Sequence, residues 1–561
     1  MLFFPNGGVK PKLKPIQAVA RKAGLPLAFL EPYGRGKAKI DWRVLKRLKG
    51  RKDGKLILVS SMNPTRFGEG KTVTTIGLAQ ALARLGKKAL ICLRQPSMGP
   101  VFGVKGGATG GGKSKVEPAE DINLMFTGDI AAVSAAANLL AALIDNHLAR
   151  GNKLGLDPDR IAWPRALDVN DRALRDITVC QGTNVCVEHE SHFVISAASE
   201  VMACLCLAND LTELKEMLGS IVVGYSRKGG TVRAVRARQL KAAGAMAAIL
   251  RDALKPNLVQ STEGIPAFVH GGPFANIAHG TNSVLATRLA LKLAHGGHVV
   301  TEAGFGSDLG LEKFMDIVSR KAGYKPDCVV LVASLKALKH HGGAREPEKR
   351  NQAALEQGFA NLEKHVENAA LFGLPCVVAI NRFPLDSAQE TEWVRGKCAA
   401  LGVEAVPSRV FAEGGRGGEE LARAVLKAVQ RPGQRPGRAH ALYSLQWPLK
   451  KKIEAIATHV YGAGRVTFSA EARRDLKRLE ALGFGRLPVC VSKTQYSLSD
   501  DPEKRGRPRG FSLRVRGAQV SAGAGFVVVY VGDLISLPGL PEKPAAERMD
   551  VDEKGEVTGL F

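Results

Sequence analysis

Short runs rich in valine, isoleucine and leucine alternate with amphipathic segments through most of the chain. The apolar runs predict buried strands, and segments with apolar residues every three or four positions predict helices. Strands separated by helices imply a mostly parallel sheet with crossover connections, hence an α/β fold. The predicted strands are 56–60, 89–93, 221–224, 298–301, 328–333 and 376–380, and the predicted helices are 73–85, 138–148 and 348–372.

The pattern changes toward the C-terminus. A basic stretch rich in proline and glycine, residues 431–438, predicts a surface linker. Short strands near 511–515 and 525–531 follow it. We therefore expect a nucleotide-binding domain from 1–149 and 298–379, an inserted domain at 150–297 and a smaller α/β portion at 380–561.

Length and composition fit a soluble protein of several domains. At 561 residues the chain is too long for one core, and its 45% hydrophobic and 24% charged residues are ordinary for a globular protein. Apolar runs stay far below the roughly 20 residues that span a bilayer, and residues 1–14 lack a secretory signal, so we expect a cytoplasmic protein without a membrane partner. The nine cysteines form no Cys-x-x-Cys pair, which favours buried thiols in a reducing compartment over a zinc site.

The charge is unusual. Eighty lysines and arginines against 53 acidic residues give a net charge of +27, which favours anionic partners. Nucleic acid, nucleotide phosphates and a polyglutamate tail all qualify. No zinc finger, RRM signature or basic zipper is present, so nucleic acid is not favoured, but charge alone does not choose.

The strongest local signal lies between the first predicted strand and helix. Residues 63–72 read Asn-Pro-Thr-Arg-Phe-Gly-Glu-Gly-Lys-Thr, close to a P-loop except that Thr65 replaces the first glycine. Backbone N–H groups of such a loop bind phosphate, Lys71 would contact the β- and γ-phosphates, and the Thr72 hydroxyl would hold Mg²⁺. The alternative is a glycine-rich turn with an incidental lysine. The residues predicted to bind nucleotide are Thr65, Arg66, Phe67, Gly68, Glu69, Gly70, Lys71 and Thr72.

Two weaker signals follow. The glycine cluster at 106–112 is either a second anion-binding loop or only a flexible connection. Arg94 comes directly after the second predicted strand, at the edge where open α/β sheets bind ligands. Its guanidinium offers a fork to phosphate or carboxylate.

Many further strings resemble one family, the formate–tetrahydrofolate ligases. The resemblance extends from about residue 12 to the last residue, and its longest motif is His-Gly-Gly-Pro-Phe-Ala-Asn-Ile-Ala-His-Gly at 270–280. Other matching strings are 93–100, 102–112, 120–129, 138–147, 199–207, 255–283, 301–313, 336–343, 493–501 and 558–561.

The resemblance implies a reaction in two steps. Formate attacks the γ-phosphate of MgATP to give formyl phosphate, and N10 of tetrahydrofolate then takes the formyl group. Lys71 and Arg94 fall on the catalytic phosphate contacts. The family also implies a potassium or ammonium activator, tetrahydrofolate or its polyglutamates as substrate, and a homotetramer.

Further site residues carry over one by one. Asp129, with Gln95 nearby, falls on the region of the monovalent cation, although a helix-capping carboxylate is the alternative. Phe305, Gly306 and Ser307 fall on the adenine side. Phe383 with Pro384, and Phe411, fall where two aromatic rings enclose the folate, although core packing of each phenylalanine is the alternative. The glycines at 414–418 would let the backbone approach there.

Several residues depart from the family pattern close to the chemistry. They are Arg66, Phe67, Val73, Lys113, Lys115, Met125, Ala132 and Phe411, with the segment 185–194. An active ligase is therefore one hypothesis, and a diverged paralogue that binds nucleotide and an anionic polymer is the other.

Overall fold

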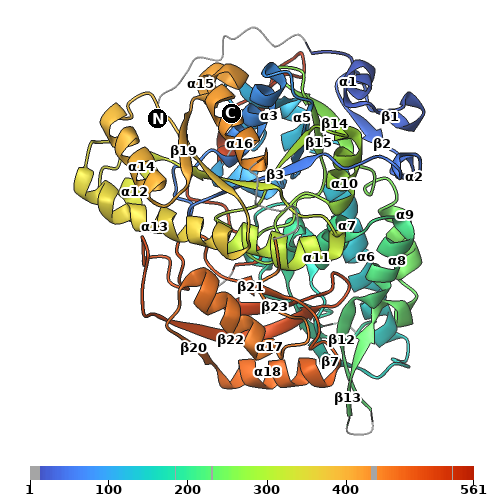
Figure 1. Ribbon diagram of the computed structural model, residues 1–561. Helices are drawn as coiled ribbons and strands as arrows, with labels where there is room; N and C mark the ends of the chain where they lie inside the picture. The colour runs from blue at the N-terminus through green and yellow to red at the C-terminus, as the bar shows by residue number, and fades with distance from the viewer. Residues whose placement is uncertain are drawn as a thin grey trace.

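The computed structural model describes residues 13–105, 107–182, 185–228, 231–430, 439–532 and 535–560. One large sheet runs through the upper half of the molecule as Figure 1 shows it, and a smaller sheet lies below it. The expected linker at 431–438 lies outside the described residues, as does Gly106.

The large sheet has twelve strands and is mostly parallel, as the alternation of apolar runs and helices predicts. Residues of β17 are all buried, as expected for a parallel strand covered on both faces. The parallel part runs in the order β15 (Pro266–Val269), β4 (Ala89–Leu93), β16 (His298–Glu302), β3 (Lys55–Ser61), β17 (Cys328–Ala333), β18 (Cys376–Asn381) and β19 (Glu404–Ser408).

An antiparallel edge extends this sheet on the β15 side. It consists of β14 (Asn257–Ser261), β2 (Ala38–Ile40) and β1 (Leu30–Pro32), while β6 (Ser114–Glu117) and β5 (Gly110–Gly111) form a hairpin that pairs with β14.

Helices cover both faces of the sheet. Alternate residues of β3 point to opposite sides, so Ile57 and Val59 pack with α3 (Lys71–Arg84) and α16 (Glu419–Gln430) in one core. Leu56 and Leu58 belong to the other core, together with residues of α10 (Val284–Ala294) and α13 (Gln352–Leu371). The remaining helices around the sheet are α1 (Ile16–Ala23), α2 (Val44–Leu48), α5 (Ala119–Asn123), α11 (Ser319–Ala322), α12 (Leu335–His341), α14 (Ala388–Ala400) and α15 (Val410–Glu413).

Small sheets and helices fill the stretch between α6 and β14. The predicted strand at 221–224 lies here and not in the main sheet: among the described residues, β12 (Val222–Lys228) pairs with β13 (Thr231–Arg236) and β7 (Leu156–Ile161). Strands β8 (Arg165–Leu167) with β11 (Phe193–Ile195), and β9 (Ile177–Val179) with β10 (His189–Ser191), form two pairs. The helices are α6 (Asp129–Ala149), α7 (Glu200–Leu207), α8 (Leu211–Ser220) and α9 (Ala243–Ile249).

The C-terminal unit is a four-stranded mixed sheet with two helices. Its strand order is β20 (Arg465–Phe468), β22 (Ser512–Ser521), β23 (Phe526–Val531) and β21 (Val489–Ser492), with α17 (Leu449–Ala455) and α18 (Ala470–Ala481) against it. The expected domain division stays a prediction. Membership of the main sheet nevertheless assigns β14, β15 and α10, and also β19 and α16, to the large layer, although these elements lie in the predicted inserted and C-terminal portions.

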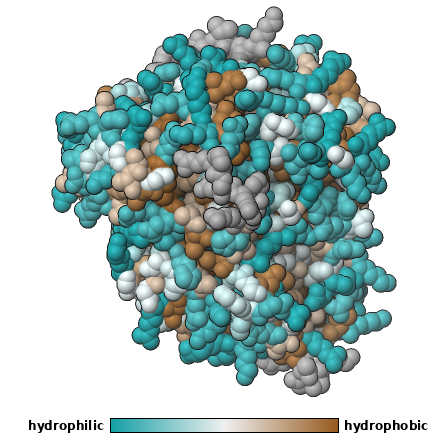
Figure 2. Space-filling view, viewed as in Figure 1, coloured by the Kyte–Doolittle hydropathy of each residue, from teal (hydrophilic) through white to brown (hydrophobic). Residues whose placement is uncertain are grey.

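Helix α6 is long and apolar enough, by length and composition, to cross a membrane, and among the described residues it is the one such helix. It packs beside α7, α9 and β8. The face of the molecule seen in Figure 2 is mostly hydrophilic, with hydrophobic residues in small scattered patches.

One expectation about the cysteines is wrong. Cys180 and Cys186 form a disulfide, with Cα atoms 5.7 Å apart. The chain turns back between β9 and β10, which pair antiparallel, and this turn brings the two side chains together. The other seven cysteines are free thiols, and six of them are buried.

A buried ion pair connects the C-terminal unit to the large sheet. Lys493, directly after β21, lies with its Nζ 2.9 Å from Oδ2 of Asp308, and both side chains are fully buried. Burial lowers the pKa of Lys493, since it disfavours the ammonium form, while the Asp308 carboxylate opposes this shift. Asn63 also donates to the Asp308 carboxylate, at 3.3 Å. The pair thus joins the end of β21 to the loops that follow β3 and β16.

Replacing Lys493 by methionine leaves the Asp308 carboxylate buried without its counter-ion, so we expect Lys493→Met to destabilise the fold by about 3–5 kcal/mol. The unfolding midpoint in urea measures this change. Lys349→Met is the matched control, because its partner Glu346 and Lys349 itself are 65% and 71% exposed, and such surface pairs contribute below about 1 kcal/mol. Equal midpoints for the two variants would contradict the importance of the buried pair.

Candidate active site

The loop between β3 and α3 (residues 62–70) is held in shape by its own side chains. Gly68 and Gly70 have φ of 76° and 81°, a left-handed backbone that favours glycine. Thr65 is outside this region, and its N–H donates to Oε1 of Glu69 at 2.8 Å. The absence of the first glycine of the motif therefore creates no conformational conflict.

Asn381, the last residue of β18, supports the end of this loop. Its Nδ2 donates to the Glu69 carbonyl at 3.1 Å, and a Cβ at Gly70 would lie 2.5 Å from the same nitrogen. Only a glycine lets Asn381 approach so closely. The start of α3, whose first N–H groups have no partner within the helix itself, is thus fixed against the neighbouring strand.

Three strand ends bring together the charged groups of the site. Lys71, at the start of α3, directs its Nζ to Oγ of Ser61, at 3.3 Å. Thr72 donates its hydroxyl to Oε2 of Glu302 at 2.8 Å, and Nε of Arg94 lies 3.9 Å from Oε1 of the same carboxylate. Glu302 is the last residue of β16, which pairs with both β3 and β4. The predicted residues Lys71, Thr72 and Arg94 therefore do meet at one edge.

Glu302 is the residue of this cluster that sequence reasoning missed. Its side chain is only 6% exposed, whereas that of Arg94 is 23% exposed, so the guanidinium reaches toward solvent from a buried carboxylate. The signal was present, because Glu302 follows an apolar run just as Arg94 does. Glu302 ends β16 just as Arg94 follows β4, so the same argument from the end of a strand applies to both residues.

The two unusual loop residues, Arg66 and Phe67, lie on the outer side of the loop. The Phe67 ring has the Nζ of Lys336 4.0 Å and the guanidinium carbon of Arg66 5.1 Å from its centroid. The His340 ring meets it edge-on at 5.7 Å. Two cations and an imidazole therefore hold Phe67 through contacts with its ring, which a small aliphatic side chain at this position could not make.

Some residues of the segment after β16 make hydrogen bonds inside the protein. Phe305 has a φ of 60°, a left-handed backbone that is rare for a bulky residue, and its carbonyl accepts from Oγ of Ser61. Ser307 is fully buried, with its Oγ 2.7 Å from Nδ1 of His365. A Cβ at Gly306 would lie 2.5 Å from Asp308. Ser307 is therefore already hydrogen-bonded inside the protein, while the ring of Phe305 remains half-buried, and the predicted adenine contacts of this segment stay a prediction.

Phe411 and Phe383 are surface residues, so the core-packing alternative is excluded for both. Their exposed fractions are 48% and 38%. Phe383 follows β18 and Phe411 follows the parallel neighbour β19, and the N–H of Arg382 donates to the Ser408 carbonyl between them. Pro384 is exposed beside Phe383. The two aromatic residues thus occupy the carboxyl ends of adjacent strands.

The glycine-rich loop at 107–112 packs directly on Phe411. The N–H of Lys113 donates to the Phe411 carbonyl at 2.8 Å, and a Cβ at Gly112 would lie 2.1 Å from that oxygen. A Cβ at Gly111 would lie 2.9 Å from the Phe411 ring. These glycines are therefore needed for close contact between two loops.

The glycines at 414–418 make their close approach to α3. A Cβ at Gly415 would lie 2.8 Å from the backbone carbon of Gln80, and one at Gly418 would lie 3.2 Å from Cβ of Ala81. Close approach was expected toward a ligand. The structure instead uses these glycines to seat the segment on the side of α3.

Asp129, the first residue of α6, is buried in an internal ion pair. Its Oδ1 lies 2.6 Å from Nζ of Lys39, and its Oδ2 accepts from Asn257 at 2.7 Å. Lys39 also donates to Oδ1 of Asn257. Gln95 is buried, and its N–H donates to the Gly271 carbonyl. The negative charge of Asp129 is thus balanced by a lysine that sequence reasoning did not single out.

The other departures occupy different surroundings. Lys113 and Met125 are exposed, and Val73 and Ala132 are half-buried. Lys115 lies 2.8 Å from Glu117 in an ion pair of β6. Of these residues, Lys113 lies next to the candidate folate site, because its N–H donates to the Phe411 carbonyl.

Burial sets the charge of two groups near Arg94. It lowers the pKa of His279 to about 3, and the cations Lys313 and Arg94 act in the same direction, so this imidazole is neutral. Burial raises the pKa of Asp168 to about 6, although its carboxylate accepts from Oγ of Ser97 at 2.5 Å and from N–H of Met98 at 2.9 Å. Asp168 thereby fixes the turn that follows Arg94.

The oxygen donors of this edge suit a hard divalent cation. Mg²⁺ in phosphate-transfer sites commonly takes one or two protein oxygens and completes its shell with substrate phosphates and water. The Thr72 hydroxyl and Glu302 carboxylate are 2.8 Å apart and provide such a pair. No cluster of three or more His, Cys, Asp or Glu among the described residues provides a metal site of the all-protein kind.

Comparison with known proteins agrees with this geometry. Residues 8–561 match the family model described as formate–tetrahydrofolate ligase. The chain is 55% identical over 556 residues to the formate–tetrahydrofolate ligase of Symbiobacterium thermophilum, and the match covers 98% of each protein. The chain therefore belongs to the formate–tetrahydrofolate ligase family and is an enzyme of the ligase class.

Proposed function

We propose that this enzyme formylates tetrahydrofolate at N10, using formate and MgATP and passing through formyl phosphate, on a P-loop NTPase-like sheet. The observation that supports this best is the cluster at three adjacent strand ends: Thr72 and Arg94 contact the Glu302 carboxylate, and Lys71 contacts Ser61 at the end of β3. Two exposed aromatic residues lie at the ends of further strands of the same sheet.

The first step needs positive charge around a transferring phosphoryl group. A formate oxygen attacks the γ-phosphorus, and the bond from that phosphorus to the β-phosphate oxygen breaks. The N–H groups at the start of α3 would bind phosphate oxygens, and Lys71 lies in the first turn of the same helix. Its ammonium would contact the β- and γ-phosphates. Arg94 would bind the formyl phosphate through its planar guanidinium.

Thr72 and Glu302 are the residues that would hold Mg²⁺, which neutralises phosphate charge when bound. Glu302 has a second role that needs no metal. It orients Arg94 through the carboxylate oxygen that Thr72 does not use. The Arg94 guanidinium is thus held in place by Glu302, while its exposed part stays available to bind an anion.

The second step needs a flat ring held close to the formyl group. N10 of tetrahydrofolate attacks the formyl carbon, the bond from that carbon to the phosphate oxygen breaks, and N10 loses a proton. Phe383 and Phe411 offer exposed aromatic faces, and stacking on a flat pterin adds to simple burial of area. Folate polyglutamates and the positive net charge of the chain are complementary in sign.

Other implications of the family stay predictions. Phe305 would contact adenine from a strained backbone next to the loop. A potassium or ammonium ion near Asp129 and Gln95 would share the Asp129 carboxylate with Lys39. The homotetramer and the cytoplasmic location belong to this group too.

The proposal is tested by formation of 10-formyltetrahydrofolate from formate, MgATP and tetrahydrofolate, with and without potassium. We expect product only when all three substrates are present. Lys71→Ala should lower kcat by about 10²–10³-fold, since it removes a charge from the transition state. Lys87→Ala, an exposed lysine just beyond α3, is the control and should keep normal turnover. No turnover by a folded protein that binds ATP and an anionic polymer would favour the paralogue hypothesis instead.

Glu302→Gln keeps the size of the side chain and removes its charge. We expect kcat to fall about 10–100-fold and the Mg²⁺ concentration for half-maximal rate to rise, because the variant weakens both the metal site and the orientation of Arg94. Initial rates over a range of MgCl₂ concentrations measure both quantities. An unchanged Mg²⁺ requirement would show that Glu302 acts only on Arg94 or on the fold.

Phe383→Ala removes one stacking face and should raise KM for tetrahydrofolate about tenfold, with KM for ATP within twofold of normal. Leu385→Ala is the control, since Leu385 is 80% exposed two residues away. Steady-state kinetics with each substrate varied in turn separate the two constants. Equal losses for both substrates would point to a structural role for Phe383.

A further inference from the structure

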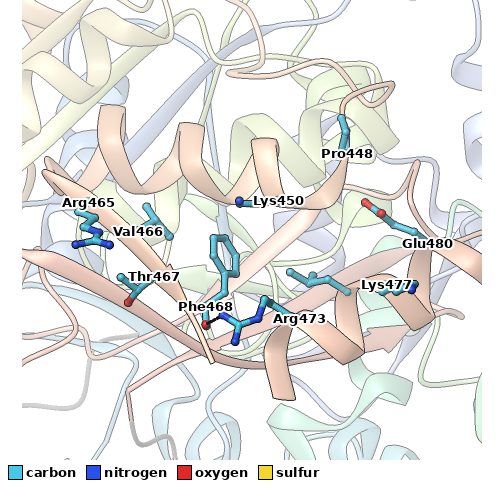
Figure 3. Close-up of a pocket in the computed structure, with 10 residues that line it drawn as sticks. Pro448, Lys450, Arg465, Val466, Thr467, Phe468, Arg473, Lys477 and Glu480 are labelled. Carbon is cyan, nitrogen blue, oxygen red and sulfur yellow. Dashed lines mark hydrogen bonds between the residues drawn. The ribbon is translucent and has the colours of Figure 1, made fainter. Parts of the chain in front are cut away.

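A cavity of about 560 Å³ lies in the C-terminal unit between α17, α18 and the edge strand β20. Figure 3 shows its lining: β20 and α17 supply one part, and successive turns of α18 supply the other. Figure 1 places α17 and α18 at the foot of the molecule, whereas α3 and α15 lie in the upper half. The cavity is therefore separate from the candidate active site.

Four cationic side chains line this cavity, Lys450, Arg465, Arg473 and Lys477, against one carboxylate, that of Glu480. Glu480 is already engaged, since its Oε1 accepts from the N–H of Leu449 at 2.9 Å. The cavity thus concentrates positive charge.

Little within the protein balances that charge. In the part of the chain that the structure describes, the side chains of Arg465 and Lys477 make no hydrogen bond or ion pair. Arg473 donates to the carbonyl of Phe468 at 2.5 Å but has no carboxylate partner there. Lys450 lies 3.9 Å from Glu454, and its Nζ lies 5.4 Å from the centroid of the Phe468 ring. Arg473 and Lys477 are one helical turn apart on α18, an arrangement of like charges that destabilises a helix. An anion between them would relieve this repulsion.

The floor between the cations is apolar. Phe468 directs its ring into the cavity in Figure 3, with Val466 from the same strand beside it. Leu476 of α18 also lines the cavity. Phe468 and Val466 are only half-buried, although their strand neighbours on β22, Val515 and Leu513, are buried. The half-buried Phe468 ring, with the Lys450 ammonium 5.4 Å from its centroid, leaves part of its surface open to a flat group.

The positions of the charges indicate the shape of a ligand. In Figure 3, Arg465 lies at one end of the lining and Lys477 toward the other, with Arg473 and Phe468 between them. A cavity of this volume holds one small organic molecule, and its lining combines apolar side chains with charged groups that can orient such a molecule. Bare phosphate would leave the apolar floor in water.

We propose that this cavity is a second ligand site, which binds a small phosphorylated molecule with an aromatic ring, of the size of a nucleoside monophosphate. The ring packs on Phe468, and Arg473 and Lys477 bind the phosphate. This inference does not depend on the proposed reaction, because no residue of the candidate active site takes part.

Equilibrium dialysis with labelled AMP on the full chain tests it. We expect the affinity of one class of sites to fall at least tenfold in Arg473→Glu/Lys477→Glu and about threefold to tenfold in Phe468→Leu. Arg474→Glu/Lys451→Glu makes the same change in charge, on α18 and α17, but at residues outside the cavity lining, and should bind AMP normally. Matching melting temperatures establish that the variants are folded.

Lys71→Ala separates this site from the active site. The component lost in Arg473→Glu/Lys477→Glu should persist in Lys71→Ala, even if the proposed catalytic role of Lys71 is wrong. Adenosine and inorganic phosphate should each bind the cavity at least tenfold more weakly than AMP. Unchanged AMP binding in Arg473→Glu/Lys477→Glu would overturn the proposal. Phosphate that binds as well as AMP, or affinity that grows with the length of a single-stranded RNA, would overturn it too, the latter in favour of a polymer surface.

Discussion

The parallel pairing of β16 with both β3 and β4 is the constraint on which the candidate active site depends. Parallel strands end at the same edge, so the residues that follow them meet whatever their separation in the chain. Lys71, Arg94 and Glu302 come from three such connections. Their side chains therefore lie close together at one edge of the sheet. The buried Glu302 carboxylate contacts both Thr72 and Arg94 and so fixes their positions relative to each other.

Sequence reasoning identified this edge because its signals are local. An apolar run, a glycine-rich turn and a helix lie consecutively at 56–84, and the structure reproduces them as β3, the loop and α3. The resemblance to a family, which the comparisons confirm, supplied the remaining residues. The predicted strand at 221–224 is present as part of β12, but a short apolar run does not specify which strands it pairs with. The Cys180–Cys186 disulfide was missed because the separation of two cysteines does not show where the chain turns.

The contacts that support the site could not be found in this way. Lys39 with Asp129, and Lys493 with Asp308, join residues that are far apart in sequence, and a lysine fully buried beside a carboxylate looks like any other lysine in the sequence. The same holds for Asn381, whose contact with Gly70 depends on the order of strands in the sheet. Exposure is equally non-local: nothing in the sequence distinguishes Phe383 and Phe411, which face solvent, from Phe314 and Phe372 in the core.

Helix α3 connects two surfaces that bind different substrates in the proposed reaction. Its first turn carries Lys71 and Thr72, while its side is packed so closely against the segment from Val410 to Gly418 that a Cβ at Gly77 would lie 2.3 Å from Cβ of Val410. Such dense packing leaves little room between the helix and this segment, so any displacement of α3 would also displace the neighbouring Phe411. If the two surfaces bind ligands as proposed, a coupling carried by the helix would change both affinities by the same factor, because such coupling is reciprocal. One helix would then connect the proposed phosphate and folate surfaces, and the order in which the two substrates bind would depend on its packing.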